Sequence, residues 1–383
     1  MTCGSGEQRR RQRGRMSAIE GMDTRTNGSV STALPRRRGR SGSGRVTISD
    51  IAQEARVSKT AVSFAFNMPG RLSKQTTEHI LAVARRMGYT PNPIARSLNT
   101  RRTNAIGLIV PQDIPDVLRN PFFAELMRGV GEVWKRGGFS LMLIPPMRGS
   151  LVDATYAALV DGCLVIGLEY DDPVVKALSQ RRIPYVMVDT DAPAHIASVN
   201  VDDCTGARMA MKHLLDLGHR RIAVVSLESH GTRFEDYHGV LRRRMNGYAA
   251  ALADYGLTLR SPGISVHECE PSVEGGRRAF HQLRAHAQPP TAAAVLSDAI
   301  AWGLIEAARM DGVQIPRDLA IVGFDDLPAS HLMQPALTTV RQSAVEKGRR
   351  AAELFLELLR TDGMCDPQHV MLPVELVVRD SSA

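Results

Sequence analysis

The chain has 383 residues, enough for two or three domains, and 43% of them are hydrophobic, which is sufficient for a sizeable core. No run of about 18 apolar residues occurs, and no apolar stretch follows the basic N-terminus, so the sequence excludes a membrane span and a secretory signal and predicts a cytoplasmic protein. Five cysteines without a C-x-x-C pair argue against a disulfide framework or a zinc site.

The net charge of +8 is distributed unevenly along the chain. Residues 1–45 carry +8 and residues 46–103 carry +6, so the remainder of the chain carries −6. A solvated tail would explain the positive charge of residues 1–45 but not that of residues 46–103. Neutralised phosphates dominate the affinity of proteins for nucleic acids. A basic N-terminal region joined to a mildly acidic remainder therefore indicates that the N-terminal region binds a polyanion.

Residues 1–45 are rich in Arg, Gly, Ser and Thr and lack apolar periodicity. Such a segment cannot bury enough apolar surface to offset the entropy lost on ordering. We therefore predict a disordered basic tail.

Residues 46–90 have the pattern of three short helices. Thr47 and Asp50 form a capping box before ISDIAQEA, and Ser58 can cap a second helix, KTAVSFAFN. Ser73 can cap a third, whose apolar residues recur on one face until Gly88 stops it. Three helices in about 45 residues predict a minimal all-α bundle.

Residues 91–103 follow as a linker with a short helix. Asn92 can cap this helix and Pro93 suits its first position, but only about two turns fit before Arg101 and Arg102. A helix of this length is marginal in water. We expect it to be ordered only when it packs against another surface.

From residue 104 to 383, apolar strand-like runs alternate with helix-length amphipathic segments, which predicts mostly parallel sheets covered by helices. The runs form two groups, at 105–110, 139–144, 163–168 and 185–189, and at 221–227, 264–268, 292–297 and 319–324. Helical stretches include 122–137, 205–217, 243–255 and 299–311. Two groups predict two α/β lobes, and a crevice at the carboxyl ends of such strands is where small molecules bind.

No common catalytic motif is present. The sequence lacks G-x-S-x-G, H-E-x-x-H, Walker A and G-x-G-x-x-G patterns, and its eleven histidines do not have metal-ligand spacing. His230 and His238 fall in the loop-like stretch 228–243, where surface histidines are ordinary. We therefore predict that the protein is not an enzyme and has neither a metal site nor a cofactor.

Seven segments between residues 46 and 380 carry a family resemblance: VTISDIAQEARVSKTAVSFAFN, GYTPNPIARSLNTRRTNAIGLIVP, NPFFAELMRGV, VDDCTGARMAMKHLLDLGHRRIAVV, AIVGFDD, PALTTV and LVVRDSS. In this order they resemble the lactose-repressor/galactose-repressor family of bacterial regulators. The resemblance implies a helix-turn-helix DNA-binding head at 46–90 and a hinge helix and linker at 91–103. It also implies a two-lobed, periplasmic-binding-protein-like domain at 104–383 for effector binding and dimerisation.

The function implied by the resemblance is that of a transcriptional regulator, in the first place a repressor. As a homodimer associated with the nucleoid, it would bind a pseudo-palindromic double-stranded operator, under the control of a small molecule, most often a sugar. Inducers and co-repressors both occur in the family, so the sign of control stays open. The alternative is a sugar-binding protein of periplasmic type, which would have no salt-dependent operator affinity.

The resemblance assigns DNA contacts to the second helix and to the hinge. Lys59 and Thr60 would face base edges, since the N-terminal part of a recognition helix enters the major groove. In the hinge, Leu98 would wedge between base pairs from the minor groove, beside Arg96 and Asn99. Contacts to phosphates are implied for Ser58, Ser63, Asn67 and Lys74. The alternatives are an ordinary solvated helix face and, for Leu98, the apolar side of a connector.

Two residues depart from the family pattern. Arg56 stands where a glycine is usual between the first two helices, at a cost of order 1 kcal/mol if the left-handed conformation persists. Phe64 stands where many relatives carry a base-reading Arg, and a phenyl ring can only touch a thymine methyl or pack. We therefore expect a half-site that departs from the family's common one.

The expected effector site combines aromatic and polar groups. Asp189 and Asp325 each follow a strand-like run, which places them at the carboxyl-end crevice, and Arg244 matches the family residue that precedes a helix. Carboxylates and an Arg suit sugar hydroxyls. Phe122 and Phe123 are expected to form an aromatic platform, with core contacts as the alternative. Ser297 is a weaker candidate, and we expect Trp302 in the core.

Overall fold

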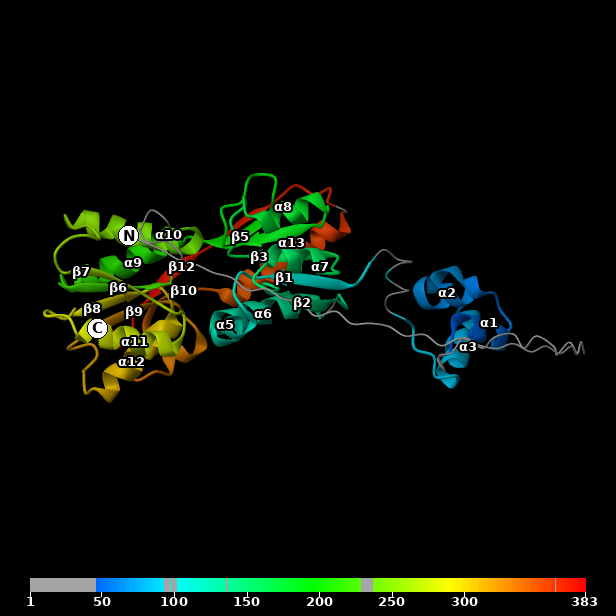
Figure 1. The fold of residues 1–383 in the computed structure, drawn as a ribbon, viewed down its shortest axis with the longest axis horizontal. Helices are drawn as coiled ribbons and strands as arrows, with labels where there is room; N and C mark the ends of the chain where they lie inside the picture. The colour runs from blue at the N-terminus through cyan, green and yellow to red at the C-terminus, as the bar shows by residue number, and fades with distance from the viewer. Residues whose placement is uncertain (1–45, 93–96, 98–101, 136, 229–236, 362) are drawn as a thin grey trace, which may run out of the picture. The chain divides into compact units, whose positions relative to one another are not determined.

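The computed structural model describes residues 46–92, 97, 102–135, 137–228, 237–361 and 363–383 (Figure 1). Of these, residues 46–65 and 72–89 form one compact unit, and residues 66–71 with those from 90 onward form another. The basic tail at 1–45 and the hinge residues Arg96, Leu98 and Asn99 lie outside the described residues. None of the helices in the described ranges is long and apolar enough to cross a membrane.

The N-terminal helices begin at the capping residues that the sequence predicts. They are α1 (Ile48–Glu54), α2 (Lys59–Asn67) and α3 (Lys74–Arg86), with a 3-10 turn η1 (Pro69–Arg71) before α3. Thr47 and Asp50 form the reciprocal capping box, and Ser73 accepts from the backbone N–H of Thr76. All three predicted helices are thereby confirmed.

A small apolar core holds the first unit together. It consists of Ile51, Ala52, Ala55, Val62, Ala65, Ile80, Val83 and Ala84. The break after α1 is made by Arg56, whose φ of 57° confirms a left-handed turn without glycine. A cost of about 1 kcal/mol for this conformation is small beside the burial of eight apolar side chains.

The second unit contains two six-stranded sheets, each the centre of one lobe. The sheet of the first lobe has the order β11-β5-β4-β3-β1-β2, and its paired strands are all parallel. Its strands are β1 (Ala105–Ile109), β2 (Ser140–Ile144), β3 (Gly162–Ile166), β4 (Tyr185–Val188), β5 (Ser198–Val201) and β11 (His369–Leu372).

The sheet of the second lobe has the order β12-β10-β9-β8-β6-β7, and only the edge strand β12 pairs antiparallel. Its strands are β6 (Ile222–Leu227), β7 (Ile264–Cys269), β8 (Ala292–Val295), β9 (Ala320–Asp325), β10 (Thr338–Gln342) and β12 (Val374–Val377). The two predicted groups of strand-like runs are therefore confirmed as two α/β lobes.

Helices cover both faces of each sheet (Figure 1). In the first lobe these are α6 (Pro121–Trp134) and α13 (Ala344–Arg360) on one face, and α7 (Leu151–Ala157) and α8 (Pro173–Gln180) on the other; α5 (Ile114–Arg119) precedes α6. In the second lobe, α9 (Asp203–Asp216) and α10 (Gly239–Asp254) oppose α11 (Val273–Arg284) and α12 (Asp298–Met310), and a 3-10 turn, η3 (Pro328–His331), follows β9.

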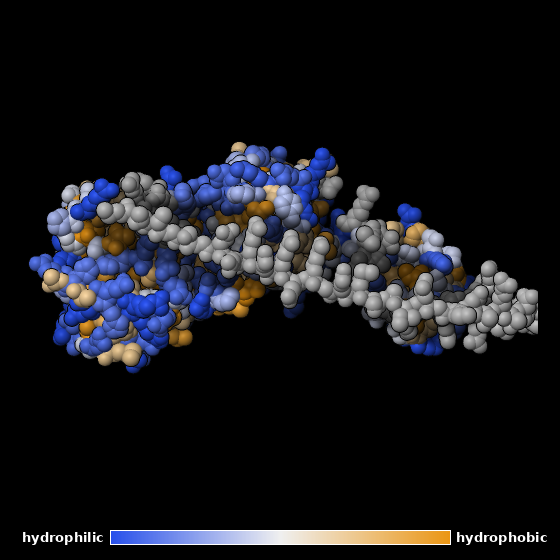
Figure 2. Space-filling view, in the orientation of Figure 1, coloured by the Kyte–Doolittle hydropathy of each residue, from blue (hydrophilic) through white to orange (hydrophobic). Residues whose placement is uncertain are grey.

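Strand alternation decides which residue meets which helix layer. In β6, Ile222 and Val224 pack toward α9 and α10, whereas Ala223 and Val225 pack toward α11 and α12. Because both of its faces are covered, β6 reads as an almost continuous apolar run. The visible exterior of this unit is mostly hydrophilic, with small hydrophobic patches (Figure 2).

The helix pair α6 and α13 packs through two glycines. A Cβ on Gly129 would lie 1.9 Å from the Val345 carbonyl oxygen, and one on Gly348 would lie 2.0 Å from that of Leu126. Only residues without a side chain permit this backbone approach. This approach holds α13 against α6 of the first lobe, although α13 follows β10 of the second lobe along the chain.

The chain crosses between the lobes three times. The crossings lie between β5 and α9, between β10 and α13, and between β11 and β12. Two expectations from the sequence are wrong: the loop-like stretch 228–243 ends early, because α10 already begins at Gly239 with His238 at its N-cap position, and Arg244 lies inside this helix rather than before it. His230 lies outside the described residues.

Candidate functional site

The second helix of the first unit presents a polar N-terminus. The Ser58 hydroxyl accepts from the backbone N–H of Ala61 at 3.0 Å and so caps the helix, while Lys59 and Thr60 are exposed. Lys74, at the start of α3, is exposed as well. Farther along α2, Ser63, Phe64 and Asn67 are half-buried.

The third helix is tied to the first by polar contacts. His79 Nε2 lies 3.3 Å from the carbonyl oxygen of Ala55, and Arg86 bonds Glu54 at 2.8 Å. Both contacts reach the turn that contains Arg56, so they brace the segment that separates α1 from α2.

In the second unit, polar groups gather where the chain crosses between lobes. Asp189 follows β4 and Asp325 ends β9, and both have positive φ values, 61° and 132°. Non-glycine residues in such conformations cost of order 1–3 kcal/mol and concentrate at ligand sites. Both side chains are buried. Both carboxylates therefore lie at the carboxyl ends of their strands, as the sequence predicts.

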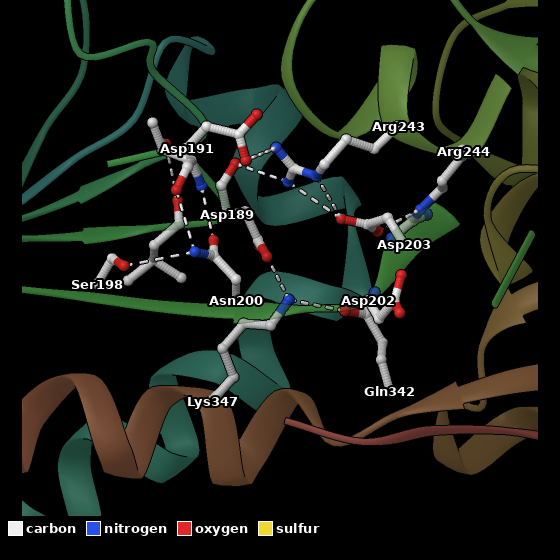
Figure 3. Close-up of polar contacts among 12 residues, drawn as sticks. Asp189, Asp191, Ser198, Asn200, Asp202, Asp203, Arg243, Arg244, Gln342 and Lys347 are labelled. Atoms are coloured by element: carbon white, nitrogen blue, oxygen red, sulfur yellow. Dashed lines mark hydrogen bonds and ion pairs between the residues drawn. The ribbon is translucent and has the colours of Figure 1, made fainter. Parts of the chain in front are cut away.

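A chain of hydrogen bonds joins these two carboxylates across the lobes, and Figure 3 shows the part formed by Asp189, Lys347 and Gln342. Lys347 of α13 donates to Asp189 at 2.5 Å and to Gln342 at 2.7 Å. The Gln342 amide in turn donates to Asp325 at 2.5 Å, and Ser297 donates to the other oxygen of Asp325 at 3.3 Å. The Lys347 side chain is fully buried, so its ammonium depends on these partners.

Two arginines of α10 complete a ring through the first residue of α9 (Figure 3). Arg244 Nε donates to Asp203 at 2.9 Å, and a terminal nitrogen of Arg244 lies 3.9 Å from Asp325. Arg243 donates to Asp203 at 3.1 Å and to the backbone carbonyl of Asp189 at 3.1 Å. The second bond crosses from the second lobe to the first. We refer to Asp189, Lys347, Gln342, Asp325, Arg244, Asp203 and Arg243 as the interlobe ring.

Burial and neighbouring cations act in opposite directions on the pKa values of two ring carboxylates, Asp203 and Asp325. Burial works to raise the pKa of Asp203, but the cations of Arg244, Lys347 and Arg243 together lower it below its ordinary value. Burial raises the pKa of Asp325, and Arg244 opposes that shift. The Arg244 guanidinium also lies 3.6 Å from the centroid of the Phe324 ring. Its cation is therefore held by carboxylates and an aromatic face.

The predicted aromatic pair divides between site and core. Phe122 is half-buried, and Lys347 Nζ lies 5.2 Å from its ring centroid. Phe123 meets the Phe122 ring edge-on at 6.0 Å and belongs to the buried cluster of the first lobe. Trp302 packs against the core of the second lobe and donates to Ser330 at 3.0 Å.

Asp298, the first residue of α12, is fully buried beside the interlobe ring. Its carboxylate accepts from the Leu327 backbone N–H at 2.9 Å and from the hydroxyls of Ser330 and Thr339, each at 2.6 Å. Burial, followed by the nearby charge of Asp325, raises the pKa of Asp298 to about 7. These bonds hold η3 and β10 against the start of α12, next to Asp325.

Asp298 predicts a pH dependence of stability. Between its ordinary pKa of 3.8 and about 7, the folded state holds a proton that the unfolded state has lost, so stability falls as the pH rises. The slope is limited to about 1.4 kcal/mol per pH unit. Asp298→Asn should flatten this decline, measured as the melting temperature from pH 4.5 to 7.5. An undiminished decline in the variant would assign it to other groups.

Sequence reasoning named Asp189, Arg244, Ser297 and Asp325, which the structure brings together. It missed four members of the ring: Lys347, Gln342, Asp203 and Arg243. A signal existed for two of them. Gln342 ends the run TTVRQ and Asp203 is the second residue after SVNV, so identifying both runs as strands would have placed them at or near carboxyl ends.

Comparison with family models matches both parts of the chain. Residues 47–92 match the model described as bacterial regulatory proteins, lacI family. Residues 211–382 match the model of a periplasmic binding protein-like domain. The first match covers the N-terminal helices, and the second covers most of the second lobe together with α13 and β11 of the first lobe.

Individual proteins extend the likeness over most of the chain. Over 343 residues the chain is 31% identical to the HTH-type transcriptional repressor PurR of Haemophilus influenzae (strain PittEE), covering 88% of this chain and 98% of that protein. It is similar to a CelR transcriptional regulator–cellobiose complex, with a TM-score of 0.63, 27% identity, and coverage of 88% and 100%. A LacI family regulator from Enterococcus faecium with bound ribose gives a TM-score of 0.62, 28% identity, and coverage of 73% and 98%.

Proposed function

The chain belongs to the lacI family of bacterial regulatory proteins, and on that basis we propose that it is a transcriptional repressor controlled by a small molecule bound between its two lobes. The observation that carries this proposal is the match to a repressor along 98% of that protein's length, including both the helical head and the lobes. The family consists of DNA-binding regulators, which disfavours an enzyme as well as a sugar-binding protein without a DNA target.

We propose residues 46–90 as the DNA-binding domain and residues 91–103 as the hinge helix and linker. Residues 1–45 would add a basic tail. Support comes from the exposed Lys59 and Thr60 at the capped start of α2, where a recognition helix meets base edges. Ser58, Ser63, Asn67 and Lys74 are proposed phosphate contacts, and Arg96, Leu98 and Asn99 the minor-groove contacts of the hinge. Phe64 would lie at the groove as an apolar contact.

We propose residues 104–383 as the effector-binding and dimerisation domain. The polar anchors would be Asp189, Arg244, Ser297 and Asp325, with Phe122 as the aromatic wall and Phe123 behind it. Their meeting at the crossings between lobes supports this assignment. The ribose and cellobiose bound by two similar regulators favour a sugar or related metabolite as effector.

Control would run through the lobes of a cytoplasmic homodimer. Each head would read half of a pseudo-palindromic operator, and an effector that prefers one lobe arrangement would shift the protein toward it. Because coupling is reciprocal, binding of operator would change the affinity for the effector by the same factor by which the effector changes the affinity for operator. The hinge helices would pair in the central minor groove only in the DNA-bound arrangement.

Selection of bound duplexes from genomic fragments, followed by binding assays between 50 and 200 mM salt, tests this function. We expect a pseudo-palindromic operator whose log affinity falls linearly with log salt. Lys59→Ala should lower the preference for operator over a scrambled duplex, with an effect of about 1–3 kcal/mol. Lys74→Ala is the matched control: it should weaken both duplexes alike and reduce the salt slope by about one.

A chain that selects no sequence and whose duplex affinity does not depend on salt would contradict the proposal. That result would favour the sugar-binding protein instead. Equal effects of Lys59→Ala and Lys74→Ala on both duplexes would leave DNA binding in place but remove Lys59 from the base-reading contacts.

A further inference from the structure

The interlobe ring balances its charges internally. Its cations are Lys347, Arg243 and Arg244, and its anions are Asp189, Asp203 and Asp325. Each cation lies within 4 Å of a ring carboxylate, at distances from 2.5 to 3.9 Å. Each of these six charged side chains is at most 18% exposed. The described part of the proposed effector site therefore contains no surplus buried charge within the ring.

This balance restricts what can enter. A ligand that inserts among these groups displaces hydrogen bonds, and hydroxyl or amide groups can replace them one for one. A phosphate or carboxylate brings negative charge into a region whose cations are already neutralised, and an uncompensated buried charge is strongly unfavourable. Asp298 adds a further buried acid and no cation.

Asp189 is the residue on which this balance depends most directly. It is the carboxylate that bonds the Lys347 ammonium, whereas Arg243 and Arg244 share Asp203. It has a positive φ, directly follows β4, and its side chain is buried. Without its charge, Lys347 would keep the neutral Gln342 amide and the Phe122 ring as neighbours, and one buried positive charge would be left over.

We propose that the effector site at the interlobe ring takes uncharged polar ligands and that Asp189 excludes anionic ones by neutralising Lys347. This inference rests on the proposed effector function and adds the chemical class of the ligand. Asp189 and Lys347 thereby become specificity-determining residues. The effector is still a sugar or related metabolite, as proposed above, but the site rejects phosphate esters of such compounds.

Titration calorimetry on the full chain with matched probes tests the proposal. The probes are D-ribose, D-glucose, cellobiose and adenosine, each with its monophosphate ester. For the wild type we expect binding to be confined to uncharged members, each preferred over its ester by about 100-fold or more. Asp189→Asn should shift this ratio toward the ester by about tenfold or more, since one buried positive charge then lacks a carboxylate.

Lys347→Met is the matched control of opposite charge, because it removes the cation and leaves the carboxylate. It should not shift the ratio toward the ester. The double variant Asp189→Asn with Lys347→Met restores neutrality and should again prefer the uncharged probe. If Asp189→Asn alone does not fold, the wild-type ratio and the double variant decide.

Three results would overturn the inference and leave the regulator function standing. The first is a phosphate ester that binds the wild type as tightly as its parent. The second is an unchanged ratio in folded Asp189→Asn. Failure of every probe to bind the folded wild type would also overturn it, because uncharged compounds of this kind are the ligands it names. The operator selection tests the regulator function separately.

Discussion

Asp203→Ala is expected to lower the free energy of unfolding by about 3–5 kcal/mol, because it leaves buried cations without their carboxylate. Asp203 is fully buried and bonds Arg244 at 2.9 Å and Arg243 at 3.1 Å. After its removal, the nearest ring carboxylate to Arg244 is Asp325 at 3.9 Å. Urea denaturation at pH 7, followed by far-ultraviolet circular dichroism, measures the loss.

The neighbouring Asp202 provides a matched control. It is exposed, and its carboxylate accepts from the Thr205 backbone N–H at 2.9 Å as the N-cap of α9. Asp202→Ala therefore removes a helix cap and should cost about 1 kcal/mol. If Asp203→Ala proved no more destabilising than Asp202→Ala, the interlobe ring would not have the energetic importance that its geometry indicates.

The sequence predicts those elements whose signals are local. Capping residues Thr47, Ser58 and Ser73 mark the starts of α1, α2 and α3 because a side chain there satisfies a free backbone N–H. Six of the eight predicted strands are buried nearly throughout, and they read as apolar runs for that reason; the edge strands β2 and β7 are partly exposed. Signals of this kind survive without any knowledge of the tertiary structure.

Four strands escaped prediction for identifiable reasons. β5 and β10 have the sequences SVNV and TTVRQ, in which polar residues interrupt the apolar pattern. β11 and β12 are short, partly exposed edge strands. They are separated by Pro373 alone and yet belong to different lobes. No local pattern contains that information, since pairing partners such as β5 lie far away along the chain.

The sequence could predict only those site residues that lie at the ends of recognisable strands. Asp189 and Asp325 follow apolar runs, and the rule that ligands bind at carboxyl ends identifies them. Lys347 lies on the amphipathic helix α13, where a lysine is ordinarily solvated. It is buried because the glycine contact with α6 draws α13 onto the first lobe, and because Asp189, 158 positions away, supplies a counter-charge.

Leu98→Gly is expected to abolish both operator bending and the effector response on DNA. The six residues 93–98 can form only about two helical turns, too few for a stable helix in water, so operator must supply the surface that orders them. Glycine removes the apolar wedge and lowers helix propensity by up to about 1 kcal/mol. Gel-shift phasing measures the bend, and operator titration with and without effector measures the response.

Leu98→Ala separates the two consequences of that change, because alanine removes the wedge but favours the helix. We expect Leu98→Ala to lose bending while keeping part of the effector response, and Leu98→Gly to lose both. Major-groove contacts from Lys59 and Thr60 remain in either variant, so a weak preference for half-sites should persist. Full operator affinity with unchanged bending in Leu98→Gly would show that the hinge is a passive connector, and coupling between cleft and operator would then require a route that bypasses residues 93–98.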